Sequence, residues 1–416
     1  MRLRFFKTFA VVALLVVLGL LSLGCGSSAT TTTVAPASST TAAPTTTTAA
    51  PTATTAAKTV EVKIGAAGPF TGALSRIGID TLNAVKFAVD EFNASQAKIK
   101  VSVEAGDDAG DPAKAALAAE KLSADAAVLG VVGPMMSASV QAALPIYEKN
   151  NLAIITPSAT NDQLSQQGYK VFHRVTPVDA AQGAALAGLI AKDVGAKKVF
   201  IVDDKSTYGQ GLADQVEKDL RTKYGVTDIQ RTQVATDDKD FAAIITKIKA
   251  FAPDAFLAAG PPPAQYAAIA KQMVQMGLKV QLIGTDSCKD QTEFIDNASG
   301  ATEGTYFTSL GPLLETSTDP KAQEFLKKYV AKYQVLSMFS GQSYEAANLL
   351  LDAITRAGDA GTITRQSVLD ALAATNYNGV LGINIQFQPN GDLKTSGVFI
   401  GQVKGAKFVQ VKAADY

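Results

Sequence analysis

The chain has 416 residues, of which 47% are hydrophobic and 18% are charged, and its formal net charge is +0. This is ordinary globular composition, long enough for two domains of typical size, and it excludes the basic surface typical of nucleic-acid binding. Two cysteines, Cys25 and Cys288, and a single histidine, His173, are too few for a disulfide framework or a His/Cys metal cluster. We therefore expect no metal and no other cofactor.

Residues 1–24 have the organisation of a secretory signal. A basic start precedes an apolar run from Phe9 to Leu21, which is too short for a comfortable membrane span. The run ends in Leu-Ser-Leu-Gly-Cys, which resembles a bacterial lipobox and implies a lipidated Cys25 as the first mature residue. A plain signal peptide or a membrane anchor is the alternative interpretation.

Residues 25–58 predict a disordered tether. They are mostly Thr, Ala, Ser and Pro, with almost no bulky apolar side chain, so they cannot bury enough surface to offset the entropy of ordering. A coil of this length reaches on the order of 30 Å. A tether that follows a lipidated cysteine would hold the folded body near a membrane.

The body starts near Thr59, and its first half alternates strands with helices. The expected elements are the strand VEVKIGAAG, a helix over 80–92, the strand KIKVSVEAGD, a helix from Asp111-Pro112 to Leu122, the strand VLGVV, a helix over 139–150 and the strand LAIIT. Asp before Pro is a typical helix start. The alternation predicts a parallel sheet with helices on both faces.

The same pattern restarts at Lys197 and predicts a second lobe. Its elements are KKVFIVDD, a helix over 211–224, VTDIQRTQVA, a helix over 240–251, DAFLAAG, a helix over 264–276 and VQLIGTD. Three further helices (321–333, 344–357 and 364–374) and the strand-like pieces INIQF, GVFIGQV and FVQV follow. These form a separate C-terminal domain, or the helices return to the first lobe and the strands to the second.

The stretch from Val128 to Thr160 contains the first candidate site. Two buried strands each run into a loop of small, hydroxylated residues, Gly133–Ser137 and Pro157–Thr160. In open α/β sheets ligands gather outside the carboxyl ends of the strands. Free amides at helix N-termini and nearby hydroxyls suit an anion such as a carboxylate. The two loops therefore predict a cradle for a small acid.

The ordered motifs TGAL, DD-x-x-DP, G-x-x-x-S, TPSAT, DDKSTYGQGLA, KDF and GLK…IGTD resemble the Leu/Ile/Val-binding group of periplasmic solute-binding proteins, which serve ABC transporters. The resemblance covers the body from Val60 to the C-terminus. It implies the type I periplasmic binding protein fold, an α/β fold in which two doubly wound parallel-sheet lobes are joined by three crossovers around a ligand cleft. We place the crossovers near residues 176, 307 and 382, which gives lobes of 59–175 plus 308–382 and 176–307 plus 383–416.

The resemblance also implies the positions that bind ligand. They are Ser75, Ser137, Ser158, Ala159, Thr160, Tyr208 and Asp286. Ser137 would donate to a carboxylate, the Ser158 carbonyl and Asp286 would face an α-ammonium, and Thr160 would hold the amino-acid head. The alternatives are structural: Ser137 as a helix N-cap, Thr160 and Gln163 as a capping box, and Asp286 as an ordinary loop acid.

The chain departs from the family on the wall that faces a ligand side chain. Pro261 stands where relatives have a pocket tyrosine, and Ile77 where they have an aromatic residue, so branched aliphatic specificity does not follow from the resemblance. Cys288, close to Asp286, is expected to be a buried or idle thiol.

Enzyme signatures are missing from the sequence: it has no G-x-S-x-G, H-E-x-x-H or Walker A motif. We expect a non-enzymatic, extracytoplasmic binding protein of an ABC importer, lipid-anchored on the outer face of the bacterial membrane. Its ligand would be an amino acid or a related small carboxylated solute, and its partners the permease and ATPase subunits, with no nucleic acid. The alternatives are a binder of an amide, urea or aromatic acid, a sensory module without transport, and a secreted α/β enzyme.

Overall fold

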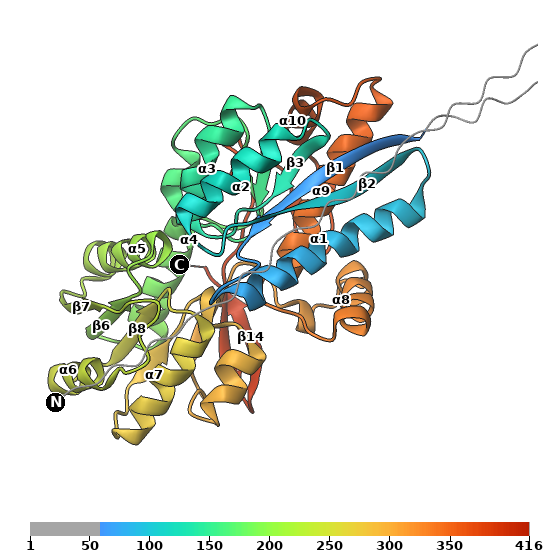
Figure 1. Cartoon of the computed structure of the whole chain (residues 1–416). Coiled ribbons are helices and arrows are strands. Elements are labelled where there is room, and N and C mark those ends of the chain that lie inside the picture. Colours follow the sequence, from blue (N-terminus) through green and yellow to red (C-terminus); the bar gives the residue numbers. More distant parts are fainter. Residues whose placement is uncertain (1–58, 416) are drawn as a thin grey trace, which may run out of the picture. The chain divides into compact units, whose positions relative to one another are not determined.

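The computed structural model describes residues 59–415, so the predicted signal sequence, the lipidated Cys25 and the tether lie outside the described residues. The first of its two main sheets is parallel, with strand order β2-β1-β3-β4-β5; Figure 1 labels its strands β1, β2 and β3. Its strands are β1 (Val60–Gly68), β2 (Ile99–Asp107), β3 (Val128–Val132), β4 (Ala153–Thr156) and β5 (Phe172–Arg174).

The second sheet has the order β14-β13-β10-β9-β8-β6-β7. Its strands are β6 (Lys198–Asp203), β7 (Asp228–Gln233), β8 (Ala255–Ala259), β9 (Gln281–Ile283), β10 (Tyr306–Ser309), β13 (Phe399–Lys404) and β14 (Lys407–Ala413). All neighbours are parallel except the C-terminal pair, where β13 runs antiparallel to both β10 and β14. Each parallel series needs helical crossovers, which cover the faces of both sheets.

Helices pack in pairs on the two sheets (Figure 1). On the first sheet, α1 (Ser75–Ser95) packs against α9 (Ser340–Asp359), and α2 (Pro112–Ala124) against α3 (Ser137–Lys149). On the second, α4 (Asp179–Gly188) packs against α5 (Thr207–Tyr224), and α6 (Ala242–Phe251) against α7 (Pro263–Gln275). None of the helices in the described part of the chain is long and apolar enough to cross a membrane.

Strand β6 shows how the second sheet builds two hydrophobic cores. Val199 and Ile201 belong to the core beneath α4 and α5, whereas Phe200 and Val202 belong to the core beneath α6 and α7. Because successive side chains of a strand point to opposite faces, a strand that is covered on both sides must be apolar at nearly every position. This explains the continuous apolar run that predicted the strand.

The late helices return to the first lobe. The core of the first sheet includes residues of α8 (Pro320–Tyr333), α9 and α10 (Arg365–Ala373), so in the described chain these helices do not form a separate domain. Ile385, Phe387 and Leu393 belong to the same core, which therefore extends past the predicted boundary at residue 382. The reason is local: INIQF contributes only the two-residue strand β12 (Asn384–Ile385), paired with β11 (Tyr377–Asn378) rather than with the second sheet.

Several elements differ from the sequence prediction. Helix α1 begins at Ser75 rather than at residue 80, and α5 begins at Thr207 rather than at 211, because the Ser206 hydroxyl accepts a hydrogen bond from the Gly209 amide (2.9 Å) and caps the helix early. Helix α4 and strands β5 and β10 were not predicted. Helix α4 reads DAAQGAALAG and is buried at most of its positions, so it lacks the polar face that marks a surface helix.

Arg174, at the end of β5, ties the loop after β4 to the returning C-terminal segment. Its side chain is fully buried, and its Nε lies 2.6 Å from Asp392 Oδ1. The same guanidinium donates to the carbonyls of Ala159 (3.3 Å) and Asn161 (3.0 Å) and to the Ser165 hydroxyl (2.9 Å). One side chain therefore positions a loop that carries predicted site residues.

Replacing Arg174 by Met should destabilise the fold strongly. The substitution leaves the mostly buried Asp392 without its cation and three acceptors without their donor, and breaking such a pair from one side costs about 3–5 kcal/mol. Urea unfolding of the Arg174→Met variant should show this loss. The Arg174→Met, Asp392→Leu double variant should recover part of it, and an unchanged midpoint for the single variant would contradict the role.

Candidate functional site

The loops after β3 and β4 lie side by side at the carboxyl end of the first sheet. The Thr156 hydroxyl donates to the Pro134 carbonyl (2.7 Å), and the Ser158 hydroxyl donates to the Met135 carbonyl (2.7 Å). Both bonds connect the end of one loop to the other. The two predicted halves of the cradle are thus held together by the protein itself.

Ser137 and Thr160 lack the structural roles offered as alternatives. Ser137 is the first residue of α3 and not its N-cap, which is Met136. The turn after β4 is capped by Asn161, whose Oδ1 accepts from the Gln163 amide (3.0 Å), so Thr160 forms no capping box. Both hydroxyls are buried, and neither has a hydrogen-bond partner among the described residues. A buried hydroxyl without a partner costs free energy, and a ligand or a water molecule would supply the missing hydrogen bond.

Ser158 and Ala159 are already engaged within the protein. The Ser158 hydroxyl is used by Met135, as described above. The Ala159 amide donates to the Thr156 hydroxyl (3.1 Å), and its carbonyl accepts from Arg174. Ala159 therefore shapes the loop through its backbone.

Asp286 and Tyr208 belong to a buried polar network in the second lobe. Asp286 opens the 3₁₀ turn Asp286–Cys288 after β9, and its carboxylate accepts from the Tyr208 hydroxyl and from the Gln182 amide. The Gln182 amide also donates to the Thr308 hydroxyl on β10 (2.8 Å). Burial raises the pKa of Asp286, and the bonds from Tyr208 and Gln182 oppose that rise.

Asp179, at the start of α4, is a site residue that the sequence reasoning missed. Its amide donates to the Thr160 carbonyl (2.9 Å), which brings α4 against the cradle loop. The residue is 1% exposed, and neither carboxylate oxygen has a well-aligned hydrogen bond among the described residues, although the Thr160 hydroxyl lies beside the carboxyl group. The sequence does contain one indication of this residue: Asp179 follows Pro177 and Val178, and an acidic residue is typical of a helix start. No helix was predicted here, so this indication was not recognised.

Burial raises the pKa of Asp179 to about 8. The neighbouring Thr160 hydroxyl and Arg174 oppose the rise, whereas the carboxylates of Asp162 and Asp286 add to it. A buried acid facing two other acids holds its proton until a cation replaces it. The second-lobe side of the site therefore favours a positively charged group.

The remaining predicted positions lie near the same region in different roles. Ser75 is the half-buried first residue of α1, and Ile77 packs with Met135, Leu310, Met338 and Phe339 in a small apolar cluster. The Pro261 carbonyl accepts from the Ser287 hydroxyl (3.1 Å), next to Asp286. Cys288 is buried as a free thiol, in agreement with the expectation. Among the described residues no group of His, Cys, Asp or Glu is arranged to hold a metal ion.

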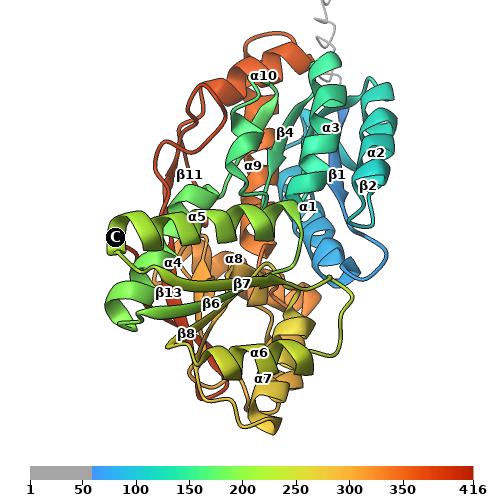
Figure 2. The same cartoon turned by 90° about the vertical axis from the view of Figure 1, so that its left-hand side faces the viewer.

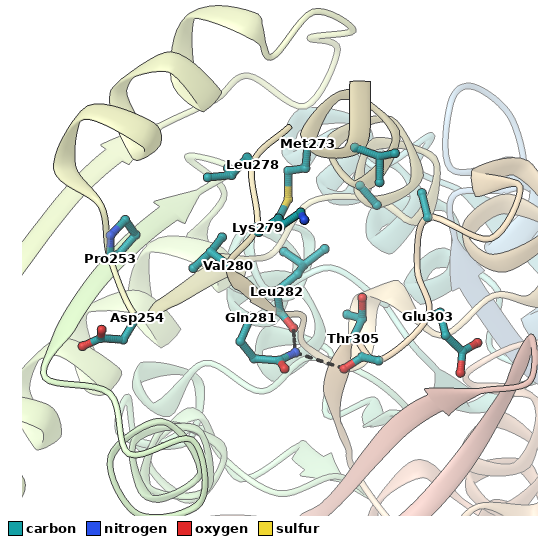
Figure 3. A pocket seen from close by; sticks show the side chains of 14 residues that line it. Pro253, Asp254, Met273, Leu278, Lys279, Val280, Gln281, Leu282, Glu303 and Thr305 are labelled. Atoms are coloured by element: carbon teal, nitrogen blue, oxygen red, sulfur yellow. Dashed lines mark hydrogen bonds between the residues drawn. The ribbon is translucent and has the colours of Figure 1, made fainter. Parts of the chain in front are cut away.

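Two pockets of the described body lie away from the predicted ligand residues. A pocket of about 540 Å³ lies beside the end of α7, between Met273, Leu278 and the loop at Glu303–Thr305 (Figure 3). Another, of about 350 Å³, is lined by 176–178 and 388–396. Neither contains a predicted ligand residue. Most of the predicted ligand residues are instead buried, whereas Ser75 and Tyr208 are half-buried.

The comparisons with known proteins identify the family and the fold. The family model for periplasmic binding proteins matches residues 61–407, and the chain belongs to that family. A Leucine-, isoleucine-, valine-, threonine-, and alanine-binding protein of Pseudomonas aeruginosa is 31% identical over 336 residues, 80% of this chain and 87% of the relative.

Two solved structures are also similar. A leucine-binding protein of Thermotoga maritima has a TM-score of 0.76 and 28% identity, covering 85% of this chain and 99% of the other. A branched-chain amino acid transporter substrate-binding protein of Streptococcus pneumoniae, in complex with isoleucine, has a TM-score of 0.76 and 27% identity, covering 85% of this chain and 100% of the other. The fold is thus the type I periplasmic binding protein fold, and the relatives are solute-binding proteins rather than enzymes.

The buried Asp179 carboxyl predicts a pH-dependent stability. Its folded pKa of about 8 lies above the unfolded value of roughly 3.9. Between these values the folded state binds a proton that the unfolded state lacks, so stability falls as pH rises. An Asp179→Asn variant lacks this slope, and its advantage over wild type should grow from pH 5 to pH 8 in urea unfolding. Parallel stability curves for the two proteins would contradict the assignment.

Proposed function

We propose that this chain is the extracytoplasmic substrate-binding protein of an ABC importer and that it captures an amino acid or a related small carboxylated solute between its lobes. The observation that supports this most directly is the pairing of unsatisfied groups in one buried place. The hydroxyls of Ser137 and Thr160 come from the first lobe, and the carboxyl group of Asp179 on α4 is a neighbour of Thr160. Hydroxyl donors suit the carboxylate of a zwitterion, and a neighbouring carboxylate suits its ammonium group.

The carboxylate of the ligand would bind at the start of α3. Here the Ser137 hydroxyl lies with the first-turn amides of a 13-residue helix, which have no intrahelical acceptors, and the loop that carries Thr160 is bonded to the loop before that helix. The ammonium would bind at Asp179, with Asp286 behind it. Charge-assisted hydrogen bonds contribute about 1.5–3 kcal/mol each. Three or four therefore account for much of the ~8 kcal/mol of a micromolar complex.

The apolar cluster next to the head-group site suggests a ligand with an apolar part. Ile77 follows Ser75 closely in sequence, Met135 precedes Ser137, and Leu310 follows Thr308, so the cluster borders the polar groups on several sides. Methionine side chains adapt to irregular shapes. We therefore propose a small ligand with a zwitterionic head and a modest apolar side chain, without committing to a branched one.

Membership of the family implies an extracytoplasmic location. We further propose that the lobes close around the ligand by bending at the segments between the sheets, and that the closed form is delivered to a membrane permease driven by ATPase subunits. Closure removes water from the head group and so strengthens its polar contacts.

Calorimetry of the mature protein against a panel of amino acids tests the ligand class. We expect at least one neutral amino acid to bind with micromolar or better affinity. Binding of an amide, urea or aromatic acid with no amino acid binding would replace the proposed ligand and remove the ammonium role of Asp179 and Asp286. Binding without a cognate permease that imports the ligand would favour a sensory module.

Removing the cradle hydroxyls should weaken binding without unfolding the protein. Ser137→Ala and Thr160→Ala each remove a donor to the carboxylate, and we expect each to raise Kd by roughly tenfold. Ser123→Ala is the matched control, because the Ser123 hydroxyl is also buried without a partner but lies at the end of α2, beside Arg365. If Ser137→Ala and Thr160→Ala both bind the ligand as tightly as Ser123→Ala does, the two hydroxyls do not form the ligand cradle.

We also propose that Cys25 is lipidated and tethers the body to the membrane. In a bacterial host, wild-type protein should fractionate with membranes, and a Cys25→Ser variant should be released in soluble form. If the variant stays with the membrane to the same extent, the lipobox interpretation is wrong.

A further inference from the structure

An ion pair joins the two lobes beside the proposed site. Arg76, in the first turn of α1, places its Nε 3.0 Å from Asp290 Oδ2 in the second lobe. The Asp290 side chain is 2% exposed and the Arg76 side chain 36% exposed. Asp290 is thus buried in the second lobe, and the more exposed Arg76 reaches it from the first lobe.

Asp290 is held in place by its own lobe. Its other carboxylate oxygen, Oδ1, accepts from the Glu293 amide (2.7 Å) and caps the turn that follows. The acid therefore stays in position if the lobes separate, and only the bond to Arg76 breaks.

Glu293 adds to the negative charge that Arg76 faces. Burial and the neighbouring Asp290 raise the pKa of Glu293, and Arg76 lowers it. Two adjacent acids repel one another, and the guanidinium relieves that repulsion only while the lobes are together. The arrangement favours the closed form over the open form.

Both ends of the ion pair are connected to the proposed ligand site through a few residues of backbone. Arg76 stands between Ser75 and Ile77 on α1, and Asp290 lies two residues after the turn Asp286–Cys288. A ligand that draws Asp286 toward the first lobe also draws Asp290 toward Arg76. On another side of the site, the Asn161 side-chain amide donates to the Thr207 carbonyl (3.2 Å), so the lobes also meet there.

We propose that Arg76 and Asp290 form an electrostatic latch that sets the free energy of lobe closure, and hence ligand affinity, without touching the ligand. The proposal rests on the proposed function, because closure around a ligand gives the latch its role. Arg76 is a positioning residue: it acts through the position of the second lobe.

The latch predicts a separation of affinity from stability. Arg76→Gln keeps a long polar side chain and removes the charge, and Asp290→Asn keeps an N-cap acceptor. Each should raise Kd for the bound amino acid by roughly tenfold and shift the unfolding midpoint little. Their effects should not add in the double variant, because each removes the same interaction. High salt should weaken binding to wild type more than binding to Arg76→Gln.

Arg356→Gln is the control for this experiment. Arg356 pairs with Asp352 at 2.8 Å within α9, so it removes an ion pair of similar cation exposure that lies inside one lobe. It should leave Kd unchanged. Additive effects of Arg76→Gln and Asp290→Asn, or an equal effect of Arg356→Gln, would overturn the latch.

A ligand-free measurement keeps the two proposals separate. Spin labels at Leu117 and Val274, which are 64% and 65% exposed on α2 and α7, report the distance between the lobes in mature protein carrying Cys25→Ser. Wild type should show a larger closed population than Arg76→Gln, and salt should reduce the difference. If no amino acid binds but this difference is seen, the ligand proposal fails and the latch stands; identical distance distributions overturn the latch.

Discussion

The buried guanidinium of Arg174 is the interaction on which the site depends most. It holds Asp392, on the segment that returns from the second half of the chain, against the loop that carries Thr160. The backbone supports the same junction, because the Arg174 amide donates to the Gly391 carbonyl (3.1 Å). A residue larger than Gly could not stand at 391, since an added Cβ would meet the Phe172 carbonyl oxygen at 1.8 Å. The crossover region is thus fixed by sterics and by charge at one point.

The site follows from the direction of the strands. The loops after β3 and β4 must lie together because parallel neighbours end at the same edge of their sheet. In the second lobe, Tyr208 follows β6, Asp286 follows β9 and Thr308 lies at the end of β10, and Gln182 on α4 connects the last two. Figure 2 shows α4 and α5 beside the second sheet, with α3 of the first lobe approaching α5. The polar groups of both lobes therefore converge on the boundary between them.

Much of the fold could be predicted from the sequence, because strands covered on both faces are continuously apolar and are separated by helices with clear starts, such as Asp111-Pro112. The elements that could not be predicted lack this difference between continuously apolar strands and helices with clear starts. Helix α4 is buried on most sides and built from small residues, and β5 is three residues long, so neither has a periodic pattern to detect. Missing α4 hid both Asp179 and Gln182. The capping positions beside Ser137 and Thr160 could not be predicted either, because a serine at a helix start is usually an N-cap, and only the backbone geometry shows that Met136 and Asn161 take the two capping positions.

The same groups that would bind a ligand oppose closure in its absence. In this structure the carboxyl group of Asp179 is buried near Asp162 and Asp286, and two hydroxyls are buried without acceptors; each of these costs free energy. The ion pair of Arg76 and Asp290 and the contact of Asn161 with Thr207 favour closure at the edges of the same cleft. If the protein had only the contacts between the lobes at the edge of the cleft, the lobes would close without a ligand. If it had only the buried groups without partners, the lobes would close weakly around a ligand. Under the proposed function, a zwitterion would shift this balance toward closure, because its ammonium would pair with the buried acids and its carboxylate would accept from the two hydroxyls.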